Sequence, residues 1–361
     1  MPTDHHSAPL SIVRRWGWPA WAVLLLVVVL LIELILVCGS ASLFQLFIPL
    51  ATGLERPVEP AAPLPAVNGL AFSPDGRWLA GGYADGTIRL WSPADGGLER
   101  VWSAGARGIS GLAFSPDGAL LASADPAGMV QLWSLESAET ALYRLSHDSP
   151  VRALAFSPDG RTLATGDWAG AIRLWSGQTG ALQGVAGRHD DWISRVVFSP
   201  DGAKLASAAN DGRVKLWDLA GSGPAAAVWS PGAAVLSLAM APDGQTLAAG
   251  TFARQIYLWS PAATGPDQPP LTAAGPVWDL AFSPDGTRLA AATEAGLQLW
   301  SPADRSAVAW PAAEPGPALS VAFSPDGALL AGGFRSGRIV VWAVETGQVR
   351  GRLDVHRSEE W

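Results

Sequence analysis

Short apolar runs alternate with tight polar turns from Val67 nearly to the end of the chain. One run in each repeat closes with the turn sequence Ser-Pro-Asp-Gly, or once Ala-Pro-Asp-Gly, and successive copies lie 42, 42, 42, 42, 42 and 41 residues apart. The turns begin at Ser73, Ser115, Ser157, Ser199, Ala241, Ser283 and Ser324. A tryptophan keeps the same step, at Trp91, Trp133, Trp175, Trp217, Trp259, Trp300 and Trp342. A period of this length predicts seven stacked copies of one supersecondary unit.

The pattern of the first repeat predicts four short strands. Residues 67–73 form an apolar run that ends at Ser-Pro-Asp-Gly, where proline presets φ and glycine accepts the left-handed conformation, so a tight hairpin follows. Residues 78–83 predict the second strand, and Asp85-Gly86 is typical of a two-residue hairpin turn. Alternation over residues 87–91 predicts the third strand, and residues 98–102 predict the fourth and outermost one.

A closed ring is the arrangement that buries such sheets. One four-stranded sheet cannot bury both of its faces, whereas seven sheets around an axis can, and the ring leaves only short edges. Gly81 and Gly82 in the second strand let neighbouring sheets approach closely, and the recurring tryptophan supplies buried area between them. These repeats resemble those of the WD40-repeat family over residues 67–356. The resemblance implies an all-β fold, a seven-bladed β-propeller.

The repeats depart from the family's pattern in places. The Trp-Asp pair that is typical of the family occurs once, at Trp217-Asp218. The fifth repeat has Ala253-Arg254 where the second turn of the first has Asp-Gly, so we expect an irregular turn there. Family propellers usually close by pairing an N-terminal strand with the last blade. Here the last repeat supplies its own fourth strand, within residues 348–356, so we expect the ring to close largely by packing.

A long apolar segment precedes the repeats and predicts one N-terminal transmembrane helix, with its apolar flank, within residues 18–50. Glu33 is the only charged residue between Pro19 and Val37, and about 20 apolar residues in a helix span a bilayer. An uncleaved signal anchor is our first interpretation. A signal peptide cleaved near Gly39-Ser40-Ala41 and a lipoprotein signal that ends at Cys38 are the alternatives.

Charge predicts how this anchor is oriented. Arg14 and Arg15 precede the apolar segment and favour a cytoplasmic N-terminus, which places the propeller outside the cytoplasm in a single-pass protein. Four prolines within residues 51–66 predict a short, stiff stalk. The predicted order is a short tail (1–17), a transmembrane signal anchor with its flank (18–50), a Pro-rich stalk (51–66), a WD40-like propeller (67–356) and a C-terminal tail (357–361).

Composition narrows the range of functions. Lys and Arg number 24 against 32 Asp and Glu, and the net charge of −8 argues against a nucleic-acid partner. Cys38 is the only cysteine, so an intrachain disulfide and a Cys-rich zinc site are both excluded. Motifs that hold a metal or cradle phosphate are absent from the sequence, and we expect neither a metal nor a cofactor.

One constellation in the fourth repeat contains the residue types of a catalytic triad. Its members, with the nearby landmark tryptophan, are His189, Ser207, Asp211 and Trp217. Nucleophilic catalysis needs a hydroxyl, an imidazole and an orienting carboxylate. The resemblance instead places these four residues in the hydrogen-bond network that stiffens a family blade, so we assign them a structural role and name no catalytic residue. The third repeat has Ala169 in the aspartate position.

Positions that differ between repeats are the better indication of function, because the fold does not require them to be constant. The series at the start of the first strand is Asn68, Ser110, Arg152, Ser194, Leu236, Trp278 and Leu319. We expect these residues around one mouth of the axial channel. Since Trp and Arg are typical interface anchors, the candidate partner-binding residues are Arg152, Trp192, Arg195 and Trp278, together with Asp279.

The sequence therefore favours a membrane-anchored, non-enzymatic scaffold that binds a protein or peptide at the channel mouth. This hypothesis depends mainly on the family resemblance, because a fold does not determine a function. The alternative is an extracytoplasmic enzyme or small-ligand sensor that uses the channel. Such a site needs convergent ionisable residues, and the series at the mouth is mostly neutral.

Overall fold

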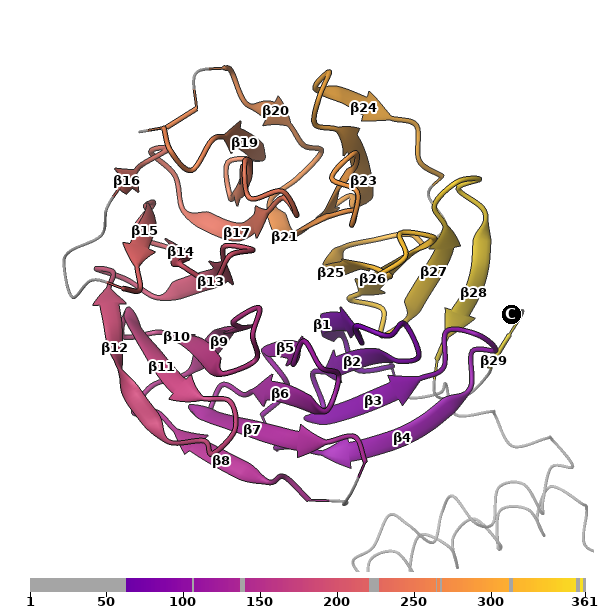
Figure 1. The fold of residues 1–361 in the computed structure, drawn as a ribbon. Helices are drawn as coiled ribbons and strands as arrows, with labels where there is room; N and C mark the ends of the chain where they lie inside the picture. Colours follow the sequence, from indigo (N-terminus) through magenta and orange to yellow (C-terminus); the bar gives the residue numbers. More distant parts are fainter. Residues whose placement is uncertain are drawn as a thin grey trace, which may run out of the picture. The chain divides into compact units, whose positions relative to one another are not determined.

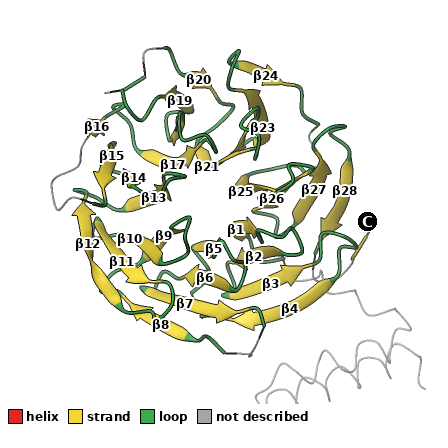
Figure 2. Ribbon diagram, in the orientation of Figure 1, coloured by secondary structure: helices red, strands yellow, loops and turns green. Residues whose placement is uncertain are grey.

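The computed structural model describes residues 63–105, 107–136, 140–220, 227–263, 265–266, 268–311, 314–354 and 358–359. The chain divides into two units, Met1–Ala62 and Pro63–Trp361, and the described residues all belong to the second. In them, β-strands form seven antiparallel sheets around a central axis (Figure 1). Figure 2 shows the same unit as strands and loops. The predicted all-β, seven-bladed propeller is thus confirmed.

The blades follow one another in chain order, four strands at a time. Blades 1 and 2 consist of β1 (Val67–Phe72), β2 (Leu79–Tyr83), β3 (Thr87–Trp91), β4 (Leu98–Ser103), and β5 (Gly111–Phe114), β6 (Leu120–Ala124), β7 (Met129–Ser134), β8 (Tyr143–Ser146). Blades 3 and 4 consist of β9 (Val151–Phe156), β10 (Thr162–Asp167), β11 (Ala171–Ser176), β12 (Leu182–Arg188), and β13 (Ile193–Phe198), β14 (Lys204–Ala209), β15 (Val214–Asp218), β16 (Ala227–Trp229). Blades 5 and 6 consist of β17 (Val235–Met240), β18 (Leu247–Thr251), β19 (Gln255–Trp259), β20 (Leu271–Thr272), and β21 (Val277–Phe282), β22 (Leu289–Thr293), β23 (Gly296–Ser301), β24 (Ser306–Val308). Blade 7 consists of β25 (Ala318–Phe323), β26 (Leu329–Phe334), β27 (Ile339–Ala343), β28 (Val349–Leu353) and β29 (Ser358–Glu359).

The Ser-Pro-Asp-Gly sequence builds the first hairpin of a blade through its side chains. In blade 1, Ser73 Oγ donates to Asp75 Oδ1 at 2.6 Å, and the same carboxylate oxygen accepts the Arg77 N–H at 3.0 Å. Ser73 Oγ also accepts the Trp78 N–H at 2.9 Å, and Gly76 has a φ of 73° that favours glycine. The hydrogen bond from Ser73 is the main cause that holds the pKa of Asp75 below its ordinary value. These aspartates therefore serve turn geometry.

The second turn of blade 5 is regular, so the expectation of an irregular turn there is wrong. Arg254 adopts a φ of 64°, which is the left-handed conformation that Gly86 adopts in blade 1. Its carbonyl accepts the Ala273 N–H at 2.8 Å, just as the Gly86 carbonyl accepts the Ala104 N–H at 2.9 Å. The surrounding hairpin imposes the turn on a residue that does not favour it.

The ring closes between blades 7 and 1 by packing, and β1 pairs with β2 of its own blade. Val67 and Tyr83 of blade 1 lie in one buried cluster with Ile339 and Val341 of blade 7. Ser320 Oγ of β25 donates to the Val67 carbonyl at 3.4 Å. Equivalent hydrogen bonds from inner-strand serines join other neighbouring blades, so this junction has the same construction as the rest.

The end of the chain corrects one predicted boundary. Two residues assigned to the C-terminal tail, Ser358 and Glu359, form β29 and pair with β28 as a fifth strand of blade 7. The predicted transmembrane segment (18–50) and the predicted stalk up to Ala62 lie outside the described residues. Within the part of the chain that the structure describes, no helix is long and apolar enough to cross a bilayer.

The landmark tryptophans fill the space between blades, and the outer strand of the preceding blade covers them in different ways. Trp102 stacks on Trp133 with ring centroids 5.6 Å apart. The ring centroid of Trp229, in the outer strand of blade 4, lies 4.7 Å from that of Trp259 in blade 5. At this outer-strand position blade 3 has Gly187, where a Cβ would lie 2.1 Å from the Trp217 ring. The outer strand is thus matched to the tryptophan that it covers.

Candidate functional site

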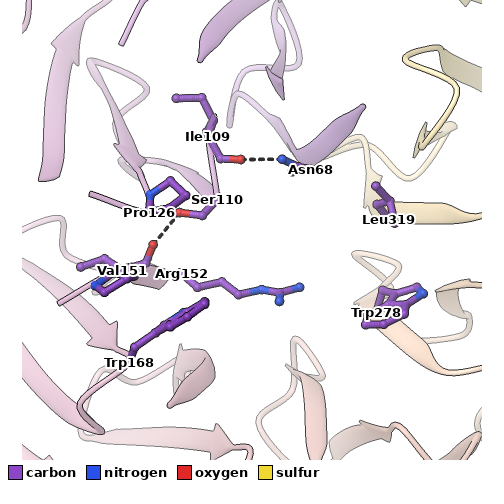
Figure 3. Close-up of a pocket in the computed structure, with 10 residues that line it drawn as sticks. Asn68, Ile109, Ser110, Pro126, Val151, Arg152, Trp168, Trp278 and Leu319 are labelled. Carbon is purple, nitrogen blue, oxygen red and sulfur yellow. Dashed lines mark hydrogen bonds between the residues drawn. The ribbon is translucent and has the colours of Figure 1, made fainter. Parts of the chain in front are cut away.

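The inner strands begin around one mouth of the axial channel. A cavity of about 250 Å³ opens there (Figure 3). Its lining comes from inner strands and turns: Asn68, Ile109, Ser110, Pro126, Pro150, Val151, Arg152, Trp168, Trp278 and Leu319. One residue further along the inner strands, the channel narrows to a space of about 20 Å³ that Arg195 and Asp279 line. The Ser-Pro-Asp-Gly turns follow the opposite ends of these strands, so they lie away from this mouth.

Arg152 is the central charged residue of this cavity. It is the second residue of β9, and Figure 3 shows its side chain extended into the cavity toward the side where Trp278 lies. The guanidinium carbon lies 5.6 Å from the centre of the Trp192 ring. Among the described residues, no carboxylate or hydrogen-bond acceptor pairs with it. Burial lowers the pKa of Arg152, although the group stays protonated at neutral pH.

Arg195 and Asp279 form an ion pair across the narrower part of the channel, between blades 4 and 6. Asp279 is 4% exposed, and its carboxylate also accepts the N–H groups of Leu280 at 3.0 Å and Val321 at 3.1 Å. Burial, and next the nearby Arg152 charge, lower the pKa of Arg195 to about 10. The carboxylate thus has three donors and neutralises Arg195 rather than Arg152.

Aromatic side chains surround the cavity. Trp168 lies in the turn between β10 and β11, is 54% exposed, and has its ring centroid 6.3 Å from that of Trp192. On the other side, Trp278 Nε1 donates to Glu294 Oε2 at 3.2 Å, and Arg335 contacts the same carboxylate at 3.3 Å. The mouth therefore combines one unpaired cation with apolar walls.

The structure brings together the candidate residues that the sequence singled out, and it adds Trp168. Arg152 and Trp278 line the cavity, Arg195 and Asp279 line the narrowing, and Trp192 packs between Arg152 and Trp168. Trp168 was missed, although it lines the cavity and is 54% exposed. The signal was available, because this turn position also varies between repeats: Ala84, Pro126, Trp168, Asn210, Phe252, Glu294 and Arg335.

The triad-like residues of blade 4 form one hydrogen-bonded chain. Trp217 Nε1 donates to Ser207 Oγ at 2.8 Å, Ser207 Oγ lies 2.7 Å from His189 Nε2, and His189 Nδ1 lies 2.9 Å from Asp211 Oδ2. Since Ser207 accepts from the indole, its own proton points to Nε2, which leaves the imidazole proton on Nδ1 to donate to Asp211. Burial is the main cause that lowers the pKa of His189, so the ring is neutral at neutral pH.

This network cannot meet a substrate in the described structure. Ser207 is 0% exposed, and so is the side chain of His189. The indole of Trp217 occupies the free side of the serine oxygen. The distances resemble those of a hydrolase triad, but the burial assigns the four residues to the interior of the blade.

Sequence comparison agrees with this architecture. Seven segments match the family model described as WD domain, G-beta repeat: residues 62–92, 98–134, 140–176, 181–218, 228–260, 269–301 and 314–343. The matches cover more than half of the chain. Each contains the three inner strands of one blade, and the second to sixth matches also contain all or part of the outer strand of the blade before it.

Proposed function

The chain belongs to the WD40 family, and from this premise we propose that it is a membrane-anchored scaffold that binds a protein or peptide at the channel mouth. WD40 propellers generally serve as protein-interaction scaffolds and are typically not enzymes. The finer assignment, to this face and to a membrane, is our proposal.

One observation carries the choice of face. The mouth holds a cavity of about 250 Å³ with an unpaired arginine and tryptophans in its wall. These are the residue types that dominate binding energy at protein interfaces. They also occupy positions that vary from blade to blade, whereas the opposite turns repeat Ser-Pro-Asp-Gly nearly unchanged. A surface that varies within a regular scaffold suits recognition of one partner.

Site-specific photo-crosslinking in cells tests this face. A photoreactive residue at Leu319, which lines the cavity, should capture a discrete partner. The same residue at Asp243, in the turn at the far end of an inner strand, is the matched control and should not. Replacing Arg152 and Trp278 together should abolish the Leu319 product. An unchanged product would reject this binding site.

The membrane part of the proposal is supported by the sequence of residues 18–50 and by Arg14 and Arg15. It places the N-terminus in the cytoplasm and the propeller outside. Two reporters fused after Trp361 test it, one active only outside the cytoplasm and one active only inside. Activity of the outside reporter is expected, and activity of the inside reporter alone would reverse the orientation.

A further inference from the structure

The cavity at the mouth contains a positive charge that no carboxylate of the described residues neutralises. Arg152, Arg195 and Asp279 are the ionisable groups that line it and its continuation. Asp279 pairs with Arg195 and accepts two backbone N–H groups besides, and it forms no ion pair with Arg152. Among the described residues, the Arg152 guanidinium contacts the face of Trp192 and pairs with no carboxylate. A guanidinium can form two charge-assisted hydrogen bonds with an anion that reaches it.

The shape of the space limits how the anion arrives. The cavity holds about 250 Å³ at the mouth, but the channel beyond it offers only about 20 Å³. A side chain can therefore enter from the open face, and a chain cannot thread through. Trp168 stands exposed at the rim and Trp278 forms the opposite wall, so apolar groups that flank the anion have surfaces to cover.

We propose that the mouth recognises a single aspartate or glutamate side chain in an extended segment of the partner, through the guanidinium of Arg152. This inference rests on the proposed function and specifies its ligand. The carboxylate forms paired hydrogen bonds with the guanidinium, and the apolar neighbours of the acidic residue pack on Trp168 and Trp278.

Charge balance favours a carboxylate over a phosphoryl group. A phosphorylated side chain carries about −1.5 to −2 charges at neutral pH and is usually held by several cations. Here Arg195 is already neutralised by Asp279, which leaves one positive charge for one negative charge. Lysines are few in the chain and do not line the cavity.

Selection from a display library of random 12-residue peptides, with the full chain in detergent micelles as the target, tests this inference. Enriched peptides should share one acidic position with apolar neighbours. A synthetic copy of the best peptide should lose about tenfold or more in affinity when its acidic residue becomes Gln. Arg152→Met removes the guanidinium but keeps an unbranched apolar side chain, and it should cause the same loss. The two changes together should cost no more than either alone.

Two further variants separate folding from recognition. Arg107→Met removes an exposed arginine in the loop before β5 and should leave the affinity unchanged. Arg152→Lys keeps a charge but not the two-pronged geometry, and should retain part of the affinity. Thermal unfolding should be the same for both Arg152 variants and the original chain, because Arg152 makes no hydrogen bond to the fold among the described residues.

The possible outcomes test the carboxylate inference and the proposed function separately. Peptides that bind through Trp168 and Trp278 but tolerate Arg152→Met, or need no acidic residue, would overturn the carboxylate inference and leave the proposed function standing. A phosphoserine copy that binds more tightly than the glutamate peptide would overturn it as well. If no enriched peptide responds to any mouth substitution, the proposed function fails and this inference fails with it.

Discussion

Blades 3 and 4 are neighbours built from the same repeat, yet they hold their landmark tryptophans differently. In blade 4, the Trp217 indole, Ser207, His189 and Asp211 form an unbroken chain of hydrogen bonds. In blade 3 the chain starts in the same way. Trp175 Nε1 donates to Thr165 Oγ1 at 2.9 Å, and that oxygen lies 2.8 Å from His147 Nε2. There it stops, because His147 Nδ1 has no partner among the described residues.

The position of one carboxylate explains the difference. Blade 3 has Ala169 where blade 4 has Asp211, and its aspartate lies two residues earlier, at Asp167. Asp167 accepts the Ala171 N–H at 2.9 Å and forms an ion pair with Arg173. It therefore holds the turn but does not bind His147 Nδ1. Asp211 holds its turn through the Arg213 N–H at 2.9 Å and reaches His189 as well. Two residues along a hairpin thus decide whether a buried imidazole is satisfied.

The same blades differ in what covers the tryptophan. Leu145 of blade 2 occupies the outer-strand position over Trp175, and Gly187 of blade 3 occupies it over Trp217. Blade 4, which has the complete hydrogen-bond network, is therefore also the blade whose tryptophan is covered by the smallest residue, Gly187. Blades 2, 5 and 7 lack a histidine at the network position, and there a second tryptophan covers the first. Aromatic packing and hydrogen bonding both fix this ring, and in blade 2 they act together, because Trp133 Nε1 also donates to Ser123 Oγ at 2.9 Å.

The largest expected effect comes from giving blade 4 the cover of blade 3. In Gly187→Leu, the new side chain must displace the Trp217 ring, because even a Cβ would lie 2.1 Å from it. We expect a loss of about 3 kcal/mol in the free energy of unfolding. Urea denaturation of the full chain in detergent measures it. Val185→Leu is the control in the same strand, at a side chain that is 54% exposed, and equal losses in both variants would contradict the packing argument.

His189→Ala breaks the network itself. Ser207 Oγ then keeps only the Trp217 indole and Asp211 Oδ2 keeps only the Asp190 N–H, so we expect a loss of about 2 kcal/mol in the free energy of unfolding. Hydrogen exchange should quicken first at the Asp190 amide, which donates to Asp211 at 3.1 Å. His147→Ala removes a shorter network and should cost less. The reverse order of the two losses would refute the comparison between the blades.

Acid should affect blade 3 through His147. Burial, with the Arg173 charge, lowers the pKa of His147 from 6.5 to about 4. Between these values the unfolded chain takes up a proton that the folded chain excludes, so stability is present above pH 6.5 and is lost as the pH falls toward 4. By pH 5.5 the stability lost through this group is about 1.4 kcal/mol. Unfolding measured from pH 7.5 to 4 should show it, and His147→Phe should flatten that part of the curve. An identical curve for the variant would assign the acid sensitivity to other groups.

Ala169→Asp should give blade 3 the arrangement of blade 4, with the smallest effect. The new carboxylate can accept from His147 Nδ1, and we expect a gain of about 0.5–1 kcal/mol in the free energy of unfolding, together with a raised pKa of His147. Histidine NMR titration measures that pKa. Ala127→Asp is the matched control in blade 2, where Gly105 stands in place of the histidine. A gain of the same size in both variants would show that turn chemistry, not the imidazole, is responsible.

Most of the fold could be predicted from the spacing of the turns and tryptophans. The strands of the first repeat, expected at 67–73, 78–83, 87–91 and 98–102, fall within one residue of β1 to β4 at each end. The turn at Arg254 was missed, since its local sequence disfavours a left-handed residue and only the rest of the hairpin imposes one. β29 was missed because two residues carry no periodicity that could reveal a strand.

The candidate site was only partly readable. Variation between repeats singled out Arg152 and Trp278, and both line the cavity because equivalent positions in a ring meet at its axis. Trp192 was selected only as a neighbour of this series. Variation between repeats could not show which of the two arginines, Arg152 or Arg195, has a carboxylate partner. The two arginines look alike in the sequence, and the one with a carboxylate partner is decided by Asp279, which lies 84 residues away from Arg195 along the chain.

The sequence by itself determined the repeat, the number of blades and the strands within them, because these follow from local turn chemistry and apolar periodicity. The tertiary structure alone decided which charges cancel, which imidazole is satisfied and which tryptophan packs on which. These pairings depend on contacts between blades, where a small shift or one added carbon atom changes which side chains meet. The unpaired charge of Arg152 at the axis is therefore a property of the closed ring and of no single repeat.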